Sequence, residues 1–388
     1  MRGRSLIIFI AITGCRRDAA APIGRSEADL PTFELAIGAL DSTTPPKFDP
    51  QFAQAVALDD TTFGVSAHPR DPVCVVVVTR PSRRTCRSVV GQGPGEVNEI
   101  EQIAAWPSGE LAVWDRQTGR LGVWNRSLRA GVSVSAFEAS STGSDLIGVQ
   151  SDSTLVIGRG RAFHEMPLGV FANPQRIERW KEGHRVPTKL LEVRGHWLSV
   201  VPIGSSGRGG LSIRSTPETF VAVSRKGSWV VDARSCVVRG VDDAGSDPPH
   251  LPACVGPSGF RASVHKQLTQ VQGAGQAEHL LYFAKSVIPE RFVGITSVLE
   301  DYGSGEMGVR LRTDEGQNAS TWLFANPGAT PHVALRLASQ WRLIGFSPSF
   351  LLLVQRDTDE SLAPTTIYWA SRRSLLGVPA AASADLKH

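Results

Sequence analysis

Residues 91–125 read GQGPGEVNEIEQIAAWPSGELAVWDRQTGRLGVWN, and this stretch decides the fold class. Turn residues interrupt it at 91–96, 107–109 and 116–119, and short apolar runs fill the spaces between them. The run LAVWD carries apolar side chains on both of its faces, which is typical of a strand that lies between stacked sheets. Strands that recur about every 8–12 residues between turns are typical of a β-sandwich, barrel or propeller.

The same unit recurs along the chain. Residues 226–241 repeat the order of turn, strand ending in Asp, short turn and strand, and fainter copies begin at residues 151 and 315. A repeat with a period of about 40–50 residues favours a propeller over a sandwich. We therefore expect an all-β fold, a β-propeller of six blades, each a four-stranded antiparallel sheet. Residues 51–372 also leave room for a seventh blade.

Part of the sequence resembles a known family. The segments 91–96, 111–115 and 120–124 are similar to the GxGPGE…VxDxxxxRxxVF pattern of bacterial six-bladed, NHL-like β-propeller lipoproteins. Residues 341–369 resemble the closing blade of that group, and Val97 stands where the family usually has Phe. The resemblance implies a fold and little about activity, because many members have no assigned function.

The residues that match this family motif are Gly91, Gly93, Pro94, Gly95, Glu96, Asp115 and Arg120. We expect them to be structural. The glycines suit a turn between blades that needs positive φ, Glu96 can accept backbone amides in that turn, and Asp115 and Arg120 can pair or cap a hairpin. Phosphate binding is disfavoured, because the spacing fits no phosphate motif and a strand follows rather than a helix N-terminus.

The first fifteen residues predict where the protein resides. Arg2 and Arg4 precede an apolar run at 6–12, and Ile-Thr-Gly-Cys at 12–15 looks like a bacterial lipobox. The run is shorter than the ~20 apolar residues that a spanning helix needs, so it predicts a cleaved signal peptide over 1–14 and lipid on Cys15. An ordinary signal peptide is the alternative. Arg16 after the cysteine, rather than Asp, favours the outer membrane.

The remaining chain divides into three expected parts. Residues 15–50 are proline-rich and predict a flexible tether that holds the body off the membrane, with an early strand within 33–40. Residues 51–372 form the propeller and 373–388 a tail. The formal charge of +4 falls to +2 once Arg2 and Arg4 leave with the signal. Near-neutral charge without a basic run argues against nucleic acid as a partner.

Five cysteines are present, and four remain if Cys15 carries lipid. Even cysteines in an exported protein indicate disulfides, and three pairings are conceivable. We favour the local one, Cys74–Cys86 with Cys236–Cys254, because a hairpin around residues 80–83 would place Cys74 nearly opposite Cys86. No CxxC pair or histidine cluster accompanies them, so we expect neither a metal nor a cofactor.

These observations favour a non-enzymatic binding module in the cell envelope, anchored by lipid, whose partner is a protein, a peptide or a glycan. The glycine- and serine-rich stretch 204–210 is a candidate binding loop. The alternative is a metal-dependent hydrolase or lyase whose ligands meet at the central channel. A structural component of a larger envelope assembly is a third reading.

Overall fold

The structure is a computed structural model of the 388-residue chain. It describes residues 30, 32–34, 41–43, 53–66, 69–79, 82–134, 144–161, 165–181, 187–205, 207–213, 218–241, 250–251, 254–271, 276–312, 319–326, 329–355 and 366–372. The predicted signal peptide, Cys15 and the predicted tail lie outside the described residues.

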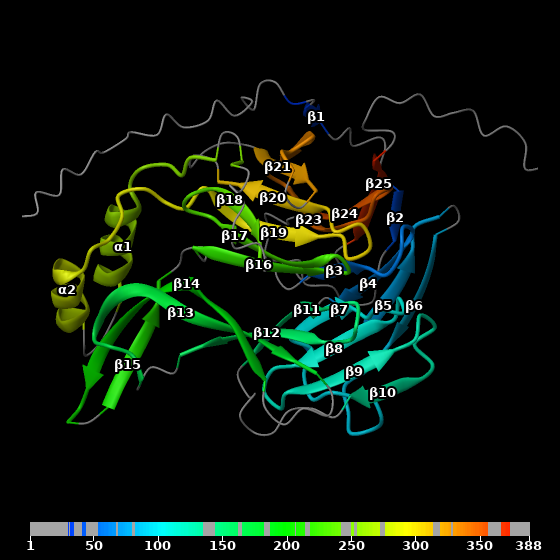
Figure 1. The fold of residues 1–388 in the computed structure, drawn as a ribbon, viewed down its shortest axis with the longest axis horizontal. Helices are drawn as coiled ribbons and strands as arrows, with labels where there is room; N and C mark the ends of the chain where they lie inside the picture. Colours follow the sequence, from blue (N-terminus) through cyan, green and yellow to red (C-terminus); the bar gives the residue numbers. More distant parts are fainter. Residues whose placement is uncertain are drawn as a thin grey trace, which may run out of the picture.

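The described residues form six β-sheets, numbered here in chain order (Figure 1). Sheet I contains β3 (Gln54–Ala57), β4 (Thr62–Ser66), β5 (Val73–Val77) and β6 (Arg83–Arg87), and sheet II contains β7 (Gln102–Ala105), β8 (Leu111–Asp115), β9 (Arg120–Trp124) and β10 (Gly131–Val134). Sheet III contains β11 (Asp145–Val149), β12 (Leu155–Gly160), β13 (Gly169–Trp180), β14 (Thr188–Ile203) and β15 (Gly207–Ser212).

The last three sheets follow the same order. Sheet IV contains β16 (Thr219–Ser224), β17 (Gly227–Asp232) and β18 (Val237–Gly240). Sheet V contains β19 (Ile295–Glu300), β20 (Met307–Leu311), β21 (Ala319–Ala325) and β22 (Val333–Ala338), and sheet VI contains β23 (Trp341–Phe346), β24 (Phe350–Gln355) and β25 (Ile367–Ser371). Sheets V and VI each gain one strand from the N-terminal region.

The first strands of the six sheets make a closed cycle of contacts. Strand β3 contacts β7, β7 contacts β11, β11 contacts β16, β16 contacts β19, β19 contacts β23, and β23 returns to β3. Sheets that stack around a common centre in this way define a β-propeller. The expected all-β propeller fold is therefore confirmed, while the number of blades stays a prediction.

Two N-terminal strands join the end of the chain. Strand β2 (Asp41–Thr43) pairs antiparallel with β25 at the outer edge of sheet VI, and β1 (Thr32–Glu34) pairs parallel with β22 in sheet V. Both strands lie within residues 15–50, for which we expected a flexible tether with an early strand at 33–40. Their pairing links the N-terminal region to the last two sheets.

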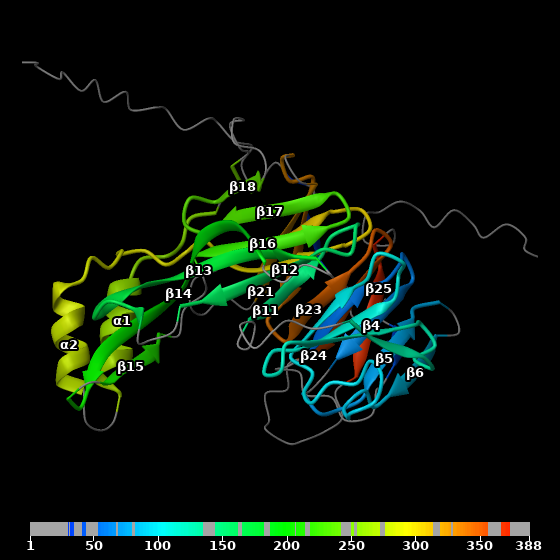
Figure 2. The same ribbon diagram turned by 60° about the horizontal axis from the view of Figure 1, so that its bottom comes forward.

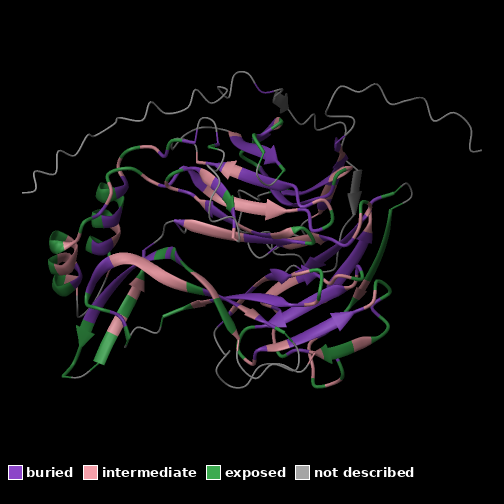
Figure 3. Cartoon of the chain, viewed as in Figure 1, coloured by how far each residue is buried: buried purple, intermediate pink, exposed green. Residues whose placement is uncertain are grey.

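Apolar side chains fill the spaces between neighbouring sheets. All five residues of β8 are buried, which fits a strand covered on both faces (Figure 3). Between sheets I and II, Val73 and Val75 pack with Leu111, Val113 and Trp124 in one cluster. Each such side chain contributes roughly 1.5–3 kcal/mol when fully buried.

One part of the molecule departs from the expected pattern. Strands β13 and β14 are 12 and 16 residues long, and β15 and helices α1 (Phe260–Thr269) and α2 (Gln276–Lys285) lie at their far end, away from sheet I (Figures 1 and 2). We call these five elements the arm. The sequence analysis predicted no helix, and residues 207–210 of the expected loop belong to β15.

The helices of the arm pack on its strands through apolar side chains. Phe260, Val264 and Leu268 are the buried residues of α1, and they share one cluster with Trp197. The Phe260 and Trp197 rings meet edge to face with centroids 5.6 Å apart. No helix among the described residues is long and apolar enough to cross a membrane.

Candidate functional site

The motif at 91–96 forms a connection between sheets I and II that folds around the Glu96 carboxylate. Glu96 Oε2 accepts a hydrogen bond from the Gly93 backbone N–H at 2.7 Å. A Cβ on Gly91 would come within 2.2 Å of that same oxygen. The Glu96 carboxylate therefore already accepts the Gly93 N–H, which an external anion would need as a donor.

Gly95 joins the connection to strand β9. It has a φ of 77°, and its carbonyl accepts a hydrogen bond from Trp124 Nε1 at 2.9 Å. A Cβ on Gly122 would lie 1.8 Å from the Gly95 oxygen, so this approach requires glycine in β9. Pro94 is exposed and Val97 is fully buried.

Asp115 is buried at the end of β8 and accepts several hydrogen bonds. Its oxygens receive the backbone N–H groups of Gln117 at 2.9 Å and Asn98 at 3.0 Å, and the Thr118 hydroxyl at 2.7 Å. Arg120 is its register partner on β9. Asp115 therefore caps its own hairpin and also ties that hairpin to the segment after the glycine motif.

Both disulfides have the expected local pairing. Cys74 and Cys86 are register partners on β5 and β6, with Cα atoms 4.1 Å apart. Cys236 and Cys254 join the end of the β17–β18 turn to the segment before α1, with Cα atoms 5.8 Å apart. A Cβ on Gly294 would come within 2.9 Å of both sulfurs of this second pair.

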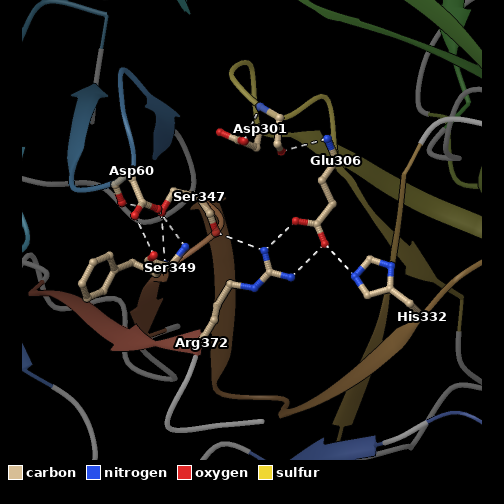
Figure 4. Close-up of polar contacts among 9 residues, drawn as sticks. Asp60, Asp301, Glu306, His332, Ser347, Ser349 and Arg372 are labelled. Carbon is tan, nitrogen blue, oxygen red and sulfur yellow. Dashed lines mark hydrogen bonds and ion pairs between the residues drawn. The ribbon is translucent and has the colours of Figure 1, made fainter. Parts of the chain in front are cut away.

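A buried ion-pair cluster, which the sequence analysis did not predict, links sheets V and VI (Figure 4). Glu306, in the turn between β19 and β20, meets Arg372 through Oε2–Nη1 at 2.6 Å and Oε1–Nη2 at 2.8 Å. His332 Nε2 lies 3.1 Å from Oε1. Burial alone would raise the pKa of Glu306, but Arg372 and His332 outweigh it and hold the pKa at about 2.

The same close-up shows how sheet VI joins sheet I (Figure 4). Asp60, in the turn after β3, accepts a hydrogen bond from the Ser349 backbone N–H at 2.9 Å and from its hydroxyl at 2.6 Å. Ser347 donates its hydroxyl to the Asp60 carbonyl at 2.7 Å. Arg372 donates to the Ser347 carbonyl at 3.1 Å, so the two contact sets are continuous.

Carboxylates gather near the starts of β7 and β11. Burial is the main reason that the pKa values of Glu101 and Asp145 are raised. Arg116 opposes both shifts and lies 3.5 Å from Asp145 through its Nε. The described residues contain no group of three or more His, Cys, Asp or Glu side chains placed to hold a metal ion.

The six first strands surround a partly open cavity of about 180 Å³. Each strand contributes to its wall, with representatives Ala55, Ile103, Ile147, Val221, Val298 and Gly345. Of the described lining residues, the titratable ones are Glu300, at the end of β19, and Tyr302 in the following turn. No signal in the sequence distinguishes these two, because the wall exists only after the ring closes.

Several large apolar side chains are exposed on or next to the arm. Six large apolar side chains are prominently exposed among the described residues, and four of them, Leu168, Ile203, Leu281 and Val287, lie on or next to the arm. Val287 is 94% exposed and Ile203 is 61% exposed. Leu168 and Val287 flank the hydrogen bond that the Val170 N–H donates to Ser286 Oγ at 3.1 Å. This group is called the arm surface below.

Known proteins resemble this chain only among solved structures, and only with low scores. No family model matches the chain, and no curated protein matches it. Among solved structures, a streptogramin B lyase is 8% identical with a TM-score of 0.41, covering 86% of this chain and 97% of that one. A DUF4221 family member from Bacteroides vulgatus is 7% identical with a TM-score of 0.40, covering 86% and 98%.

A third structure, YCF48 bound to D1 peptide, is 8% identical with a TM-score of 0.38, covering 88% of this chain and 99% of that one. Scores at this level carry no argument about function. The propeller assignment of this chain rests on its own closed cycle of sheets.

Proposed function

We propose that this protein is a binding module of the bacterial cell envelope: a β-propeller of the NHL-like lipoprotein type, held at the outer membrane by lipid on Cys15, that contacts a partner protein through its arm. The arm surface carries the proposal. Exposed apolar side chains that gather on one projecting element are typical of a protein interaction site. Scattered single ones would need no such explanation.

The chemistry of the arm surface favours a protein or peptide over a glycan. Leu168, Ile203, Leu281 and Val287 offer aliphatic groups, which gain free energy when another apolar surface removes them from water. The arm also has its own support, since α2 packs on β13 and β14. A rigid element positions such a surface without the cost of ordering a loop on binding.

The two disulfides support the location within the proposal. Cys74–Cys86 and Cys236–Cys254 pair as expected for a protein that folds in an oxidising compartment. Export to such a compartment is what the predicted signal peptide and lipobox at Cys15 would achieve. A three-chain lipid modification would anchor the protein stably, since anchoring takes more than one acyl chain.

The experiment compares two charge variants of the full-length lipoprotein. Ile203→Asp and Val287→Asp together place charge on the arm surface, and Val132→Asp does the same on β10, where the side chain is 64% exposed. After chemical cross-linking in intact cells, a discrete adduct should form with the wild type and the Val132 variant and disappear with the arm variant. An adduct that survives the arm variant, or forms with none of the proteins, would refute the proposal.

A further inference from the structure

We propose that the cavity at the centre of the ring is a binding site for a small primary amine, with the apolar part of the ligand among the first strands and its ammonium group against the Glu300 carboxyl. The inference is independent of the arm and of the membrane anchor.

The size and the wall of the cavity set the class of ligand. A cavity of about 150 Å³ holds a molecule of the size of benzene, and this one, whose wall mixes polar and apolar groups, measures about 180 Å³. Val56, Ile103, Ile147, Val221 and Val298 supply aliphatic wall from five different strands. The site therefore suits a compact molecule of roughly that size that carries both an apolar part and a polar group, and it is too small for a nucleotide.

Glu300 supplies the polar anchor. Glu300 is one of the residues that line the cavity, and its Oε2 is buried and has no hydrogen-bond partner. A buried carboxyl oxygen without a partner costs free energy that a donor can recover. The last torsion of a glutamate side chain is broad, so a small rotation of the carboxyl presents this oxygen to a ligand. An ammonium group is the donor that matches it in charge.

The groups around Glu300 fix the protonation change on binding. Burial raises the pKa of Glu300 well above its usual value, the Asp301 carboxylate adds to this, and the Val223 backbone opposes it. Tyr302 and Arg225 lie next to them, with the guanidinium 5.5 Å from the centre of the tyrosine ring. No further described lining residue is titratable.

The free protein therefore keeps a proton on Glu300 at pH values where an exposed glutamate has lost it. When the ammonium ion binds, that proton leaves to solvent, and the carboxylate accepts an N–H donor in place of its own O–H. The buried pair is then neutral overall, as a buried ion pair must be to be tolerated. Because one proton is released, amine affinity should rise by up to tenfold per pH unit below the pKa of Glu300.

The test uses isothermal titration calorimetry on the full chain with benzylamine, and with benzyl alcohol as the uncharged analogue. Benzylamine should bind more tightly as the pH is raised stepwise from 4 to 8, whereas benzyl alcohol should bind equally throughout. Absence of benzylamine binding, or the same pH response for both ligands, would overturn the proposal.

Two variants test the Glu300 carboxyl and the volume of the cavity separately. Glu300→Gln should weaken benzylamine at least tenfold, remove its pH dependence and leave benzyl alcohol unchanged. Val298→Phe fills part of the cavity and should abolish binding of both ligands while Glu300 is intact. If Glu300→Gln fails to fold, the Val298 variant and the wild-type pH response still decide the matter. Unchanged benzylamine binding in either folded variant would count against the site.

Discussion

The Glu306–Arg372 ion pair offers the sharpest stability prediction. Glu306→Gln keeps the size of the side chain and removes its charge. Arg372 is only 8% exposed, so the variant leaves a buried guanidinium without its counter-charge. Breaking a buried pair in this way costs about 3–5 kcal/mol. We expect the free energy of unfolding at pH 7 to fall by an amount in this range.

The pH dependence of the lost unfolding free energy shows whether the charge of Glu306 is its cause. The pKa of Glu306 is about 2 in the folded protein and 4.5 without the fold. Because the folded value is the lower one, the charge stabilises the fold fully above pH 4.5, and this contribution is lost as pH falls towards 2. At about 1.4 kcal/mol per pKa unit the contribution is roughly 3 kcal/mol, of which about 2 kcal/mol should disappear between pH 7 and pH 3.

The measurement is urea unfolding followed by tryptophan fluorescence at both pH values, with disulfides intact. Glu290→Gln is the matched control, because Glu290 is exposed and lies 3.9 Å from Arg261; exposed pairs of this kind contribute about 0–1 kcal/mol. The difference in unfolding free energy between wild type and Glu306→Gln should be smaller at pH 3 than at pH 7. The reasoning would be refuted if Glu306→Gln lowered the unfolding free energy by less than 1 kcal/mol at pH 7, or if its difference from wild type were the same at pH 3 as at pH 7.

Three further predictions concern the anchor, a disulfide and the glycine motif. Cys15→Ser should move the protein from the membrane to the soluble fraction in cell fractionation; a variant that stays with the membrane would rule out lipid as the anchor. Cys254→Ser should lower stability by about 3 kcal/mol in denaturant unfolding, as expected for a loop of this length; an unchanged midpoint would contradict it. Gly122→Ala should destabilise by more than 1 kcal/mol, because its Cβ would lie 1.8 Å from the Gly95 oxygen; Ala130→Gly, outside this contact, should change the midpoint little by comparison.

Local patterns in the sequence were sufficient for much of the fold. Turn residues and two-faced apolar runs predicted the first three strands of sheet II but not β10, because both signals depend on neighbours only a few positions apart. The pairing of Cys74 with Cys86 followed from the same local reasoning, since a hairpin sets the register. The closed ring could be inferred only through repetition of this unit.

Other features depend on contacts that local patterns do not contain. Glu306 and Arg372 are 66 positions apart and come from different sheets, so nothing near either residue marks the pair. The pKa of Glu300 is raised by burial, and this burial exists only once the ring of sheets has formed. Helix α1 did leave a signal, with Phe260, Val264 and Leu268 at helical spacing, but the strand repeat on both sides obscured it.

We propose that the arm holds a partner while lipid holds the protein at the membrane. The most direct measurement places a photo-activatable cross-linking amino acid at position 287 on the arm and, in a second protein, at position 132 on β10. Irradiation of intact cells should yield one discrete adduct in the membrane fraction from position 287 and none from position 132. No adduct from position 287, or the same adducts from both positions, would contradict the account.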